Sequence, residues 1–313
     1  MQYKINKQLA SNLLMIRPCQ FFSNPQTADS NKFQGRSKLS DNELQEAAVY
    51  EFDMLVSKLK DADMNVCVFE DTPEPITPDS VFPNNWVSFH SDGTVVFYPM
   101  EAENRRLERR LDIIERLKEE HGFNVKKIID MSYLEKKQMY LEGTGSMILD
   151  HINKIAYACL SSRTHKNALQ DFSKEMGFSP IPFYAKDALG SDVYHTNVLM
   201  SLGEKLAILC EDAIPLDSEK KQVKDSLQST GHEIVTISLD QMTSFAGNTL
   251  EVISNSDENL MLMSERAEKS LTKKQKSTIE KYCRIVSSPI QNIEDSAGGS
   301  VRCMIAEIAL PKK

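Results

Sequence analysis

The chain lacks the cysteine and histidine spacing of a metal site or a disulfide framework. Its six cysteines lie far apart, at positions 19, 67, 159, 210, 283 and 303. They form no Cys-x-x-Cys pair, and no histidine cluster of metal-ligand spacing lies near them. Zinc sites and disulfide-stapled small domains both need such closely spaced residues. We therefore expect reduced thiols and no bound metal.

Long apolar runs and an excess of positive charge are also missing. No apolar stretch of 18 residues occurs, and the first ten residues contain no apolar run of signal-peptide length. The 37 Lys and Arg residues are outnumbered by 45 Asp and Glu residues, which gives a net charge of −8. Nucleic-acid and anionic-membrane partners require clustered basic side chains. We expect a cytoplasmic protein that acts on a small molecule.

No linker rich in Pro, Gly or Ser divides the 313 residues. The content of 41% hydrophobic and 26% charged residues is ordinary for a globular protein with a full core. We expect one α/β domain over residues 1–313, with residues 1–14 as an N-terminal extension. The two most loop-like stretches, residues 22–40 and 71–85, are long for connections in a compact fold, and we expect one or both to form an active-site lid.

Five segments with the periodicity of amphipathic helices recur at even spacing. They begin near Asp41, Arg105, Arg163, Asp217 and Thr272, which places their starts 64, 58, 54 and 55 residues apart. Asp217 is a candidate N-cap, and Thr272 with Gln275 has the form of a capping box. The apolar face of the second segment would contain Leu107, Leu111, Ile114 and Leu117.

Short β-branched or aromatic runs lie between these helices. They cover residues 66–69, 94–98, 146–149, 155–158, 206–209, 233–237 and 260–263. Each period thus holds a few strands and one helix. A doubly wound sheet would also alternate strands with helices, but it has no reason to keep four such even intervals. We predict five ββαβ modules arranged around an axis, as a five-bladed, pseudo-symmetric α/β propeller.

A candidate nucleophile lies close to the C-terminus. The sequence Gly298-Gly299-Ser300-Val301-Arg302-Cys303 brings one cysteine behind two glycines and next to an arginine. A thiol attacks as its thiolate, and we expect the neighbouring guanidinium to favour that form, while the glycines allow the backbone to approach a substrate closely. A buried, inert cysteine is the ordinary alternative for a single such residue.

Two further candidates precede the cysteine in the chain. Glu142 begins a glycine-rich turn, Glu142-Gly143-Thr144-Gly145, and His195 lies in Tyr194-His195-Thr196-Asn197. Cys, His and a carboxylate suffice for nucleophilic substitution at a planar carbon. Cys303 would attack, His195 would transfer protons, and Glu142 would orient the imidazole and accept a hydrogen bond from a substrate N–H. The segment 245–251 precedes the last module, and its role stays open.

The order of these motifs resembles the guanidino-group-modifying superfamily, the penteins, which includes arginine deiminases, dimethylarginine hydrolases and amidinotransferases. The resemblance rests on Glu-Gly-x-Gly, His-x-Asn and Gly-Gly-x-x-Arg-Cys-Met and spans about residues 15–309. It implies a five-bladed α/β propeller and a Cys303, His195 and Glu142 enzyme without a metal or organic cofactor. It also makes Arg105, Arg106 and Arg163 candidates for binding a substrate carboxylate, since segments around them resemble those of the deiminases.

The departures from the superfamily pattern concern charge. Arginine-processing relatives place carboxylates in Phe-x-Arg-Asp and His-x-Asp, where this chain has Asn85, after Asn84, and Asn197. A buried cation without its anionic partner is costly, whereas an asparagine side chain can bind a neutral ureido group through both its N–H and its C=O. Turn-forming asparagines are the ordinary alternative. The resemblance therefore favours the citrulline-hydrolysing branch, with L-ornithine, ammonia and carbon dioxide as products.

Four alternatives stay open at this point, three of them enzymes. A deiminase, a dimethylarginine-type hydrolase or an amidinotransferase would use the same three catalytic residues. A non-catalytic propeller that only binds a partner belongs to a different class, and retention of Cys303, His195 and Glu142 argues against it. The sequence also leaves the oligomeric state open, and a homo-oligomer is possible.

Overall fold

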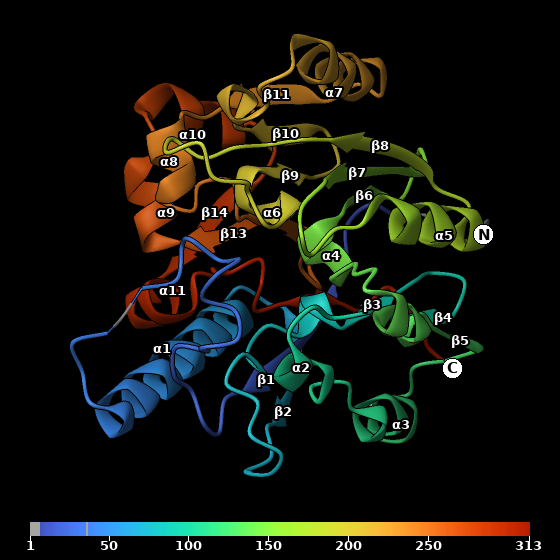
Figure 1. The fold of residues 1–313 in the computed structure, drawn as a ribbon, viewed down its shortest axis with the longest axis vertical. Coiled ribbons are helices and arrows are strands. Elements are labelled where there is room, and N and C mark those ends of the chain that lie inside the picture. The colour runs from blue at the N-terminus through green and yellow to red at the C-terminus, as the bar shows by residue number, and fades with distance from the viewer. Residues whose placement is uncertain (1–6, 36) are drawn as a thin grey trace.

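Five small sheets of identical connectivity make up the molecule. The computed structural model describes residues 7–35 and 37–313. In each sheet a short first strand runs antiparallel to a central strand, which crosses over through one or two helices to a third, parallel strand. The modules surround a common centre, with the crossover helices on the outside (Figure 1). This arrangement confirms the predicted ββαβ modules.

The elements of each module are as follows, with the first strand named first. Module one contains β15 (Ala306–Glu307), β1 (Asn12–Arg17), α1 (Asp41–Asp61) and β2 (Asn65–Glu70). Module two contains β3 (Val87–Phe89), β4 (Thr94–Phe97), α2 (Glu103–Arg106), α3 (Leu111–Glu119) and β5 (Lys127–Asp130). Module three contains β6 (Ile148–Asp150), β7 (Ile155–Cys159), α5 (Lys166–Met176) and β8 (Ser179–Phe183). Module four contains β9 (Met200–Leu202), β10 (Leu206–Leu209), α7 (Asp217–Ser229) and β11 (Glu233–Thr236). Module five contains β12 (Leu250–Ile253), β13 (Asn259–Ser264), α9 (Glu265–Ser270), α10 (Lys273–Ile279) and β14 (Arg284–Ser288).

The two ends of the chain meet in the first module. Strand β15 pairs antiparallel with β1, with Leu13 opposite Glu307 and Leu14 opposite Ala306. The C-terminal strand therefore completes the sheet that the N-terminal strand begins. This pairing corrects the expected extension over residues 1–14, because β1 begins at Asn12 and residues 12–14 are part of the sheet; residues 1–6 lie outside the described residues.

The outer helices form where apolar periodicity and capping residues coincide. Helix α1 begins after Ser40, whose side chain forms a capping box with Glu43. Its inner face buries Leu44, Phe52 and Leu55 against the sheet of module one. Burial of side chains of this size stabilises the fold by roughly 1.5–3 kcal/mol each. The predicted capping box of Thr272 with Gln275 is present at the start of α10.

Three helix boundaries differ from the sequence-based expectation. The helix predicted from Arg105 is split into α2 and α3, and Leu107 and Leu111 are 51% and 58% exposed, so the apolar face does not continue through them. Helix α5 starts at Lys166, three residues after Arg163. Asp217 is not an N-cap but the first residue of α7, where a carboxylate still favours the helix dipole.

Short elements precede the first strands and bring them toward the centre. They are the 3-10 turn η1 (Pro83–Asn85), helix α4 (Gly143–Ser146) and helix α6 (Thr196–Leu199), and α4 contacts both η1 and α6. First strands of different modules also contact one another: β15 with β3, β6 with β9, and β9 with β12. The remaining elements are η2 (Ser132–Lys137), η3 (Glu211–Ala213), α8 (Leu239–Thr243) and α11 (Gln291–Ala297). Within residues 7–35 and 37–313, no helix is long and apolar enough to span a membrane.

Candidate active site

Each module contributes to one site from the turn that leads into its first strand. We call these segments the approach turns: residues 83–85, 142–146, 195–199, 246–249 and 300–304. They carry Asn85, Glu142, His195 with Asn197, Asn248 and Cys303, in chain order. Because the first strands lie near the centre, side chains more than 200 residues apart in sequence can meet there. The five modules thus place different side chains at equivalent positions.

Backbone hydrogen bonds and a glycine shape the turn that carries the cysteine. The N–H of Cys303 donates to the carbonyl of Ser300 over 2.9 Å, and the hydroxyl of Tyr194 donates to the carbonyl of Gly298 over 2.6 Å. Gly298 has φ +67°, and a Cβ there would lie 2.6 Å from the backbone nitrogen of Gln34. Only glycine fits this left-handed, crowded position. The paired glycines thus serve packing at the site, and Cys303 is 3% exposed.

The arginine beside the cysteine has other partners than the sulfur. The guanidinium of Arg302 donates to the carbonyl of Ile305 over 3.1 Å and to the carboxylate of Glu307 over 2.8 Å. Its charge is therefore paired along the chain that continues into β15. The expectation that Arg302 supplies the positive charge at the nucleophile is wrong, because adjacent residues in a turn direct their side chains to different surroundings.

Two amides contact the sulfur instead. The Nδ2 atoms of Asn197 and Asn248 lie 3.3 and 3.2 Å from Sγ of Cys303. Asn197 was predicted at the site, whereas Asn248 lies in the segment 245–251 whose role the sequence left open. A usable signal existed: Asn248 stands two residues before β12, as Asn85 stands two residues before β3.

Glu142 and His195 form a buried pair. Nε2 of His195 lies 2.9 Å from Oε2 of Glu142, and Oε1 of Glu142 accepts a hydrogen bond from the N–H of Glu101 over 3.0 Å. Since Nε2 must carry the hydrogen that it shares with the carboxylate, Nδ1 is the basic nitrogen of the ring. The predicted orienting role of Glu142 toward the imidazole agrees with this geometry.

Burial and charge determine the protonation of this pair. Burial would raise the pKa of Glu142, but Arg163, His195 and Arg105 outweigh that effect and lower the pKa to about 2. Burial lowers the pKa of His195 to about 4, although the hydrogen bond and the charge of Glu142 oppose the shift. Near neutral pH the imidazole is therefore neutral and can accept a proton, next to an ionised carboxylate.

The two glycines of the Glu-Gly-x-Gly turn allow close packing around this pair. Gly143 has φ +50°, and a Cβ there would lie 2.2 Å from the carbonyl oxygen of Asn84. A Cβ on Gly145 would lie 2.4 Å from Nδ2 of Asn85 and 2.7 Å from Nδ1 of His195. Residue 145 therefore has no room for a side chain beside the amide and the imidazole.

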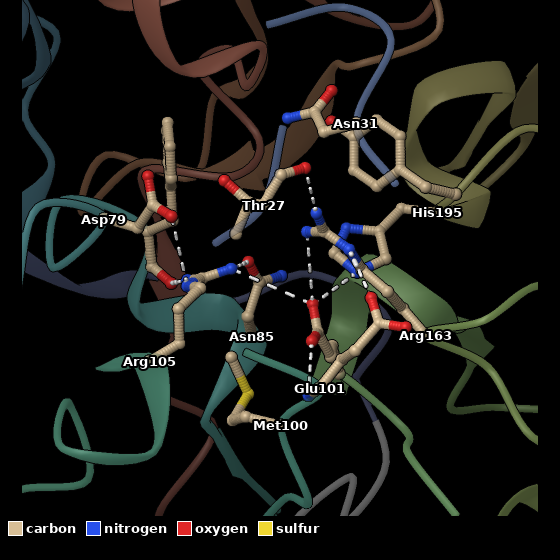
Figure 2. Close-up of polar contacts among 12 residues, drawn as sticks. Thr27, Asn31, Asp79, Asn85, Met100, Glu101, Arg105, Arg163 and His195 are labelled. Atoms are coloured by element: carbon tan, nitrogen blue, oxygen red, sulfur yellow. Dashed lines mark hydrogen bonds and ion pairs between the residues drawn. The ribbon is translucent and has the colours of Figure 1, made fainter. Parts of the chain in front are cut away.

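Two of the three predicted arginines line the site. Nη1 of Arg105 donates to Oδ1 of Asn85 over 2.9 Å, and its guanidinium also forms a bidentate ion pair with Glu108 at 2.9 Å. Arg163 donates to Oγ of Ser30 over 2.8 Å and stacks over the ring of Tyr194. In Figure 2 the side chains of Arg105 and Arg163 extend from opposite sides toward the middle of the site.

The third arginine lies elsewhere. Arg106 is bonded to the carbonyls of Met100 and Glu101 over 3.0 Å each, and it does not line the cavity. Neighbouring positions on the short helix α2 face different directions, so only one of the pair 105 and 106 can reach the centre. The expectation that Arg106 binds substrate loses its geometric basis, and we assign Arg106 to fixing the backbone at residues 100–101.

The asparagines of η1 have unsatisfied polar atoms. Nδ2 of Asn85 is buried without a hydrogen-bond partner, and so is Oδ1 of Asn197. Asn84 is fully buried, and both polar atoms of its amide lack a partner. Neither Asn84 nor Asn197 lines the cavity, and Asn197 reaches the site through its contact with the sulfur of Cys303. Buried polar groups are normally bonded, so an unpartnered donor and an unpartnered acceptor beside a nucleophile indicate where a ligand binds.

A narrow cavity of about 10 Å³ lies beside these groups. Asn85, Arg105, Arg163, Tyr194, His195 and Cys303 line it together with Thr27, Asn31, Asp79, Phe82, Ala297 and Gly299. Both long loops of the sequence contribute here, the first through Thr27 and Asn31 and the second through Asp79 and Phe82. Nδ2 of Asn24 donates to the carboxylate of Asp79 over 2.7 Å and so ties the loops together. That one or both loops move as a lid stays a prediction.

In the part of the chain that the structure describes, no group of three or more His, Cys, Asp or Glu side chains is arranged to hold a metal ion.

Comparisons with known proteins agree with the fold. Residues 17–310 match the model of a family described as N,N dimethylarginine dimethylhydrolase, eukaryotic. Unliganded ArgZ, an arginine dihydrolase from the ornithine-ammonia cycle in Cyanobacteria, has a similar structure, with a TM-score of 0.71 and 18% identity over 96% of this chain. The chain spans 41% of full-length ArgZ but 96% of its N-terminal domain, solved with bound substrate as a cysteine-to-serine mutant at a TM-score of 0.69 and 18% identity over 94% of this chain.

A third similar structure is DDAH from Pseudomonas aeruginosa, a cysteine-to-serine mutant complexed with citrulline. The TM-score is 0.62 and the identity 14%, over 95% of this chain and 99% of that one. At such identities these likenesses show the fold. No curated protein sequence matches the chain. Because the family model spans nearly the whole sequence, the chain belongs to the N,N-dimethylarginine dimethylhydrolase family, whose enzymes are hydrolases acting on carbon–nitrogen bonds, and thus to the guanidino-group-modifying pentein superfamily.

Proposed function

We propose that this enzyme hydrolyses L-citrulline to L-ornithine, ammonia and carbon dioxide, with Cys303 as the nucleophile. The observation that carries the proposal is a pair of unsatisfied amide atoms, one on Asn85, which lines the cavity with Cys303, and one on Asn197, whose amide contacts the sulfur. Nδ2 of Asn85 can donate to a ureido oxygen, and Oδ1 of Asn197 can accept from a ureido N–H. A neutral ureido group needs one such donor and one such acceptor.

The charges around the cavity also favour a neutral reacting group. Arg105 and Arg163 line the cavity, and the carboxylates beside them are already ion-paired, Glu108 with Arg105 and Glu101 with Arg163. A guanidinium substrate would add a further cation to these pairs. The carboxylate of Glu142 is already bonded to His195 and to the N–H of Glu101. A buried cation without a free anionic partner is destabilised by several kcal/mol. A ureido group avoids this cost.

The amino-acid end of the substrate finds complementary charges at the same cavity. The planar guanidinium of Arg163 suits a carboxylate, which can replace its hydrogen bonds to the hydroxyl of Ser30 and the carbonyl of Thr27. Asp79 also lines the cavity, and its carboxylate can attract an α-ammonium group. Both ends of a zwitterionic amino acid would then be bound by opposite charges.

The chemistry follows from the protonation states. The thiol proton of Cys303 passes to Nδ1 of His195, the sulfur attacks the ureido carbon, and the imidazolium is stabilised by Glu142. One carbon–nitrogen bond breaks as that proton moves to the leaving amine, which leaves a thiocarbamate on the sulfur. Water then attacks with His195 as base, the carbon–sulfur bond breaks, and loss of carbon dioxide from the resulting carbamate completes the reaction.

The relatives act on related groups. The matched family is named for dimethylarginine, and ArgZ is an arginine dihydrolase, so the alternative for this chain is a guanidino substrate processed by the same three residues. An amidinotransferase would also use them and would need an amine acceptor. The DDAH structure with citrulline is consistent with a pentein cavity that accepts a ureido amino acid.

The test compares substrates directly. Purified protein is incubated separately with citrulline, arginine and dimethylarginine, and ornithine, ammonia and citrulline are measured. We expect ornithine and ammonia from citrulline, with loss of activity in Cys303→Ala and full activity in Cys19→Ala, a partly exposed cysteine that does not line the cavity. Citrulline formed from arginine or dimethylarginine would reject the proposal in favour of the guanidino alternative.

A further inference from the structure

One amide connects three modules at the nucleophile. Nδ2 of Asn248 donates to Sγ of Cys303 over 3.2 Å and to the carbonyl of Asn197 over 3.0 Å. Its Oδ1 accepts from the N–H of Arg302 over 3.1 Å. Asn248 is 1% exposed, so its amide is shielded from water, and these three contacts use both of its hydrogens and its oxygen.

We propose that Asn248 is a catalytic residue that, with Asn197, stabilises the thiolate of Cys303. The inference rests on the proposed role of Cys303 as the nucleophile. Asn248 comes from the approach turn of module five, Asn197 from that of module four, and Cys303 from that of module one. Two amide N–H groups thus converge on one sulfur from separate elements.

The physical reason is the difference between the two forms of the sulfur. A thiolate accepts hydrogen bonds more strongly than a thiol does, because bonds to a charged acceptor are about twice as strong as neutral ones. In a buried site such donors are already oriented and displace no water when the charge forms. The guanidinium of Arg302 is paired with Glu307, so the groups that contact the sulfur are amide dipoles.

The same amide sets the direction of attack. Its oxygen fixes the N–H of Arg302, the residue before the cysteine, and its nitrogen fixes the sulfur itself. When the new carbon–sulfur bond forms, the sulfur loses its negative charge, and its hydrogen bonds from the amides of Asn248 and Asn197 become weaker. A group of this kind changes the rate of the chemical step more than substrate binding, since Asn248 does not line the cavity.

The decisive variant is Asn248→Asp. Aspartate has the same shape and keeps an acceptor for the N–H of Arg302, but it replaces the donor with a negative charge beside the sulfur. We expect thiolate absorbance in the ultraviolet at pH 8, taken as the difference from Cys303→Ala, to fall sharply. We expect kcat on citrulline to fall at least about tenfold, with KM within about threefold of the parent. Asn255→Asp is the matched control, because the amide of Asn255 donates to the carbonyl of Asp63 far from the site.

Each outcome decides the matter. Unchanged thiolate absorbance and kcat in Asn248→Asp, or no thiolate signal in the parent protein, would overturn the inference. If Asn248→Asp does not unfold cooperatively, Asn248→Ala carries the same expectation without the added charge. A parent protein that forms the thiolate in an Asn248-dependent way but leaves citrulline intact would refute the proposed substrate and retain the role of Asn248.

Discussion

At the residue scale, the site differs from a cation-binding one by the identity of a few polar atoms. Oδ1 of Asn85 accepts from Arg105 while its Nδ2 has no partner. An aspartate at position 85 would keep the first contact and lose the second. The proposed preference for a neutral ligand can therefore be tested by replacing the amide of Asn85 with a carboxylate.

We expect Asn85→Asp to reduce kcat/KM for citrulline at least about tenfold and to improve arginine as a substrate relative to citrulline. The carboxylate introduced at position 85 would have no hydrogen to donate to the ureido oxygen. Losing a hydrogen bond to a buried polar group costs about 1–3 kcal/mol. Competition kinetics with both substrates measures the ratio. An unchanged ratio would separate substrate choice from Asn85, and Asn255→Asp again serves as the control.

At the element scale, the approach turns matter more than the helices that made the repeat visible. Helix α4 and turn η1 pack so closely that residues 143 and 145 leave no room for a side chain. The long loops before α1 and η1 contribute lining residues without regular secondary structure of their own. Function in this fold is built on the segments between the repeating elements.

Gly145→Ala should lower kcat at least about a hundredfold, because the added Cβ would displace the amide of Asn85 and the imidazole of His195. A displacement of about 1 Å in a catalytic group costs that much. Gly190→Ala is the comparison: residue 190 has φ +82° and nothing within 4 Å of an added Cβ. It should lose about 1–2 kcal/mol of stability through backbone strain and retain kcat. Steady-state kinetics and urea unfolding of both variants check this, and an active Gly145→Ala enzyme would contradict the packing argument.

At the scale of the whole molecule, buried polar groups between modules make stability depend on pH. His90 is 4% exposed, and its Nε2 lies 2.8 Å from the hydroxyl of Ser88, which is itself 2.6 Å from the hydroxyl of Tyr98. Burial lowers the pKa of His90 to about 4. The unfolded chain takes up a proton near pH 6.5, and the folded protein does so only near pH 4, so the free energy of unfolding falls as the pH drops through this window.

The contribution of His90 to that loss is about 2–3 kcal/mol between pH 7 and pH 4.5. His90→Gln removes the titration while keeping a hydrogen-bonding side chain. We expect the difference in free energy of unfolding between parent and variant to shrink by this amount over that range. Urea unfolding at both pH values measures it, and a difference that stays constant would show that His90 titrates normally.

The repeat was readable from the sequence because it is local. Apolar spacing, capping residues and β-branched runs each depend on neighbours within a few positions, and they predicted five modules in the correct order. Helix α1 and the capping box at Thr272 follow this rule. The split between α2 and α3 does not, because the polar side chains of residues 105–110 bind to groups elsewhere in the molecule.

The sequence by itself determined the modular architecture and selected Cys303, His195 and Glu142 as catalytic candidates, since both predictions rest on residue type and spacing. Only the tertiary structure decided what each polar group contacts. It paired Arg302 with Glu307, kept Arg106 out of the cavity and brought Asn248 to the sulfur. The reason is geometric: Asn248 and Cys303 are 55 residues apart, and no local periodicity records which side chains of separate modules meet at a shared centre.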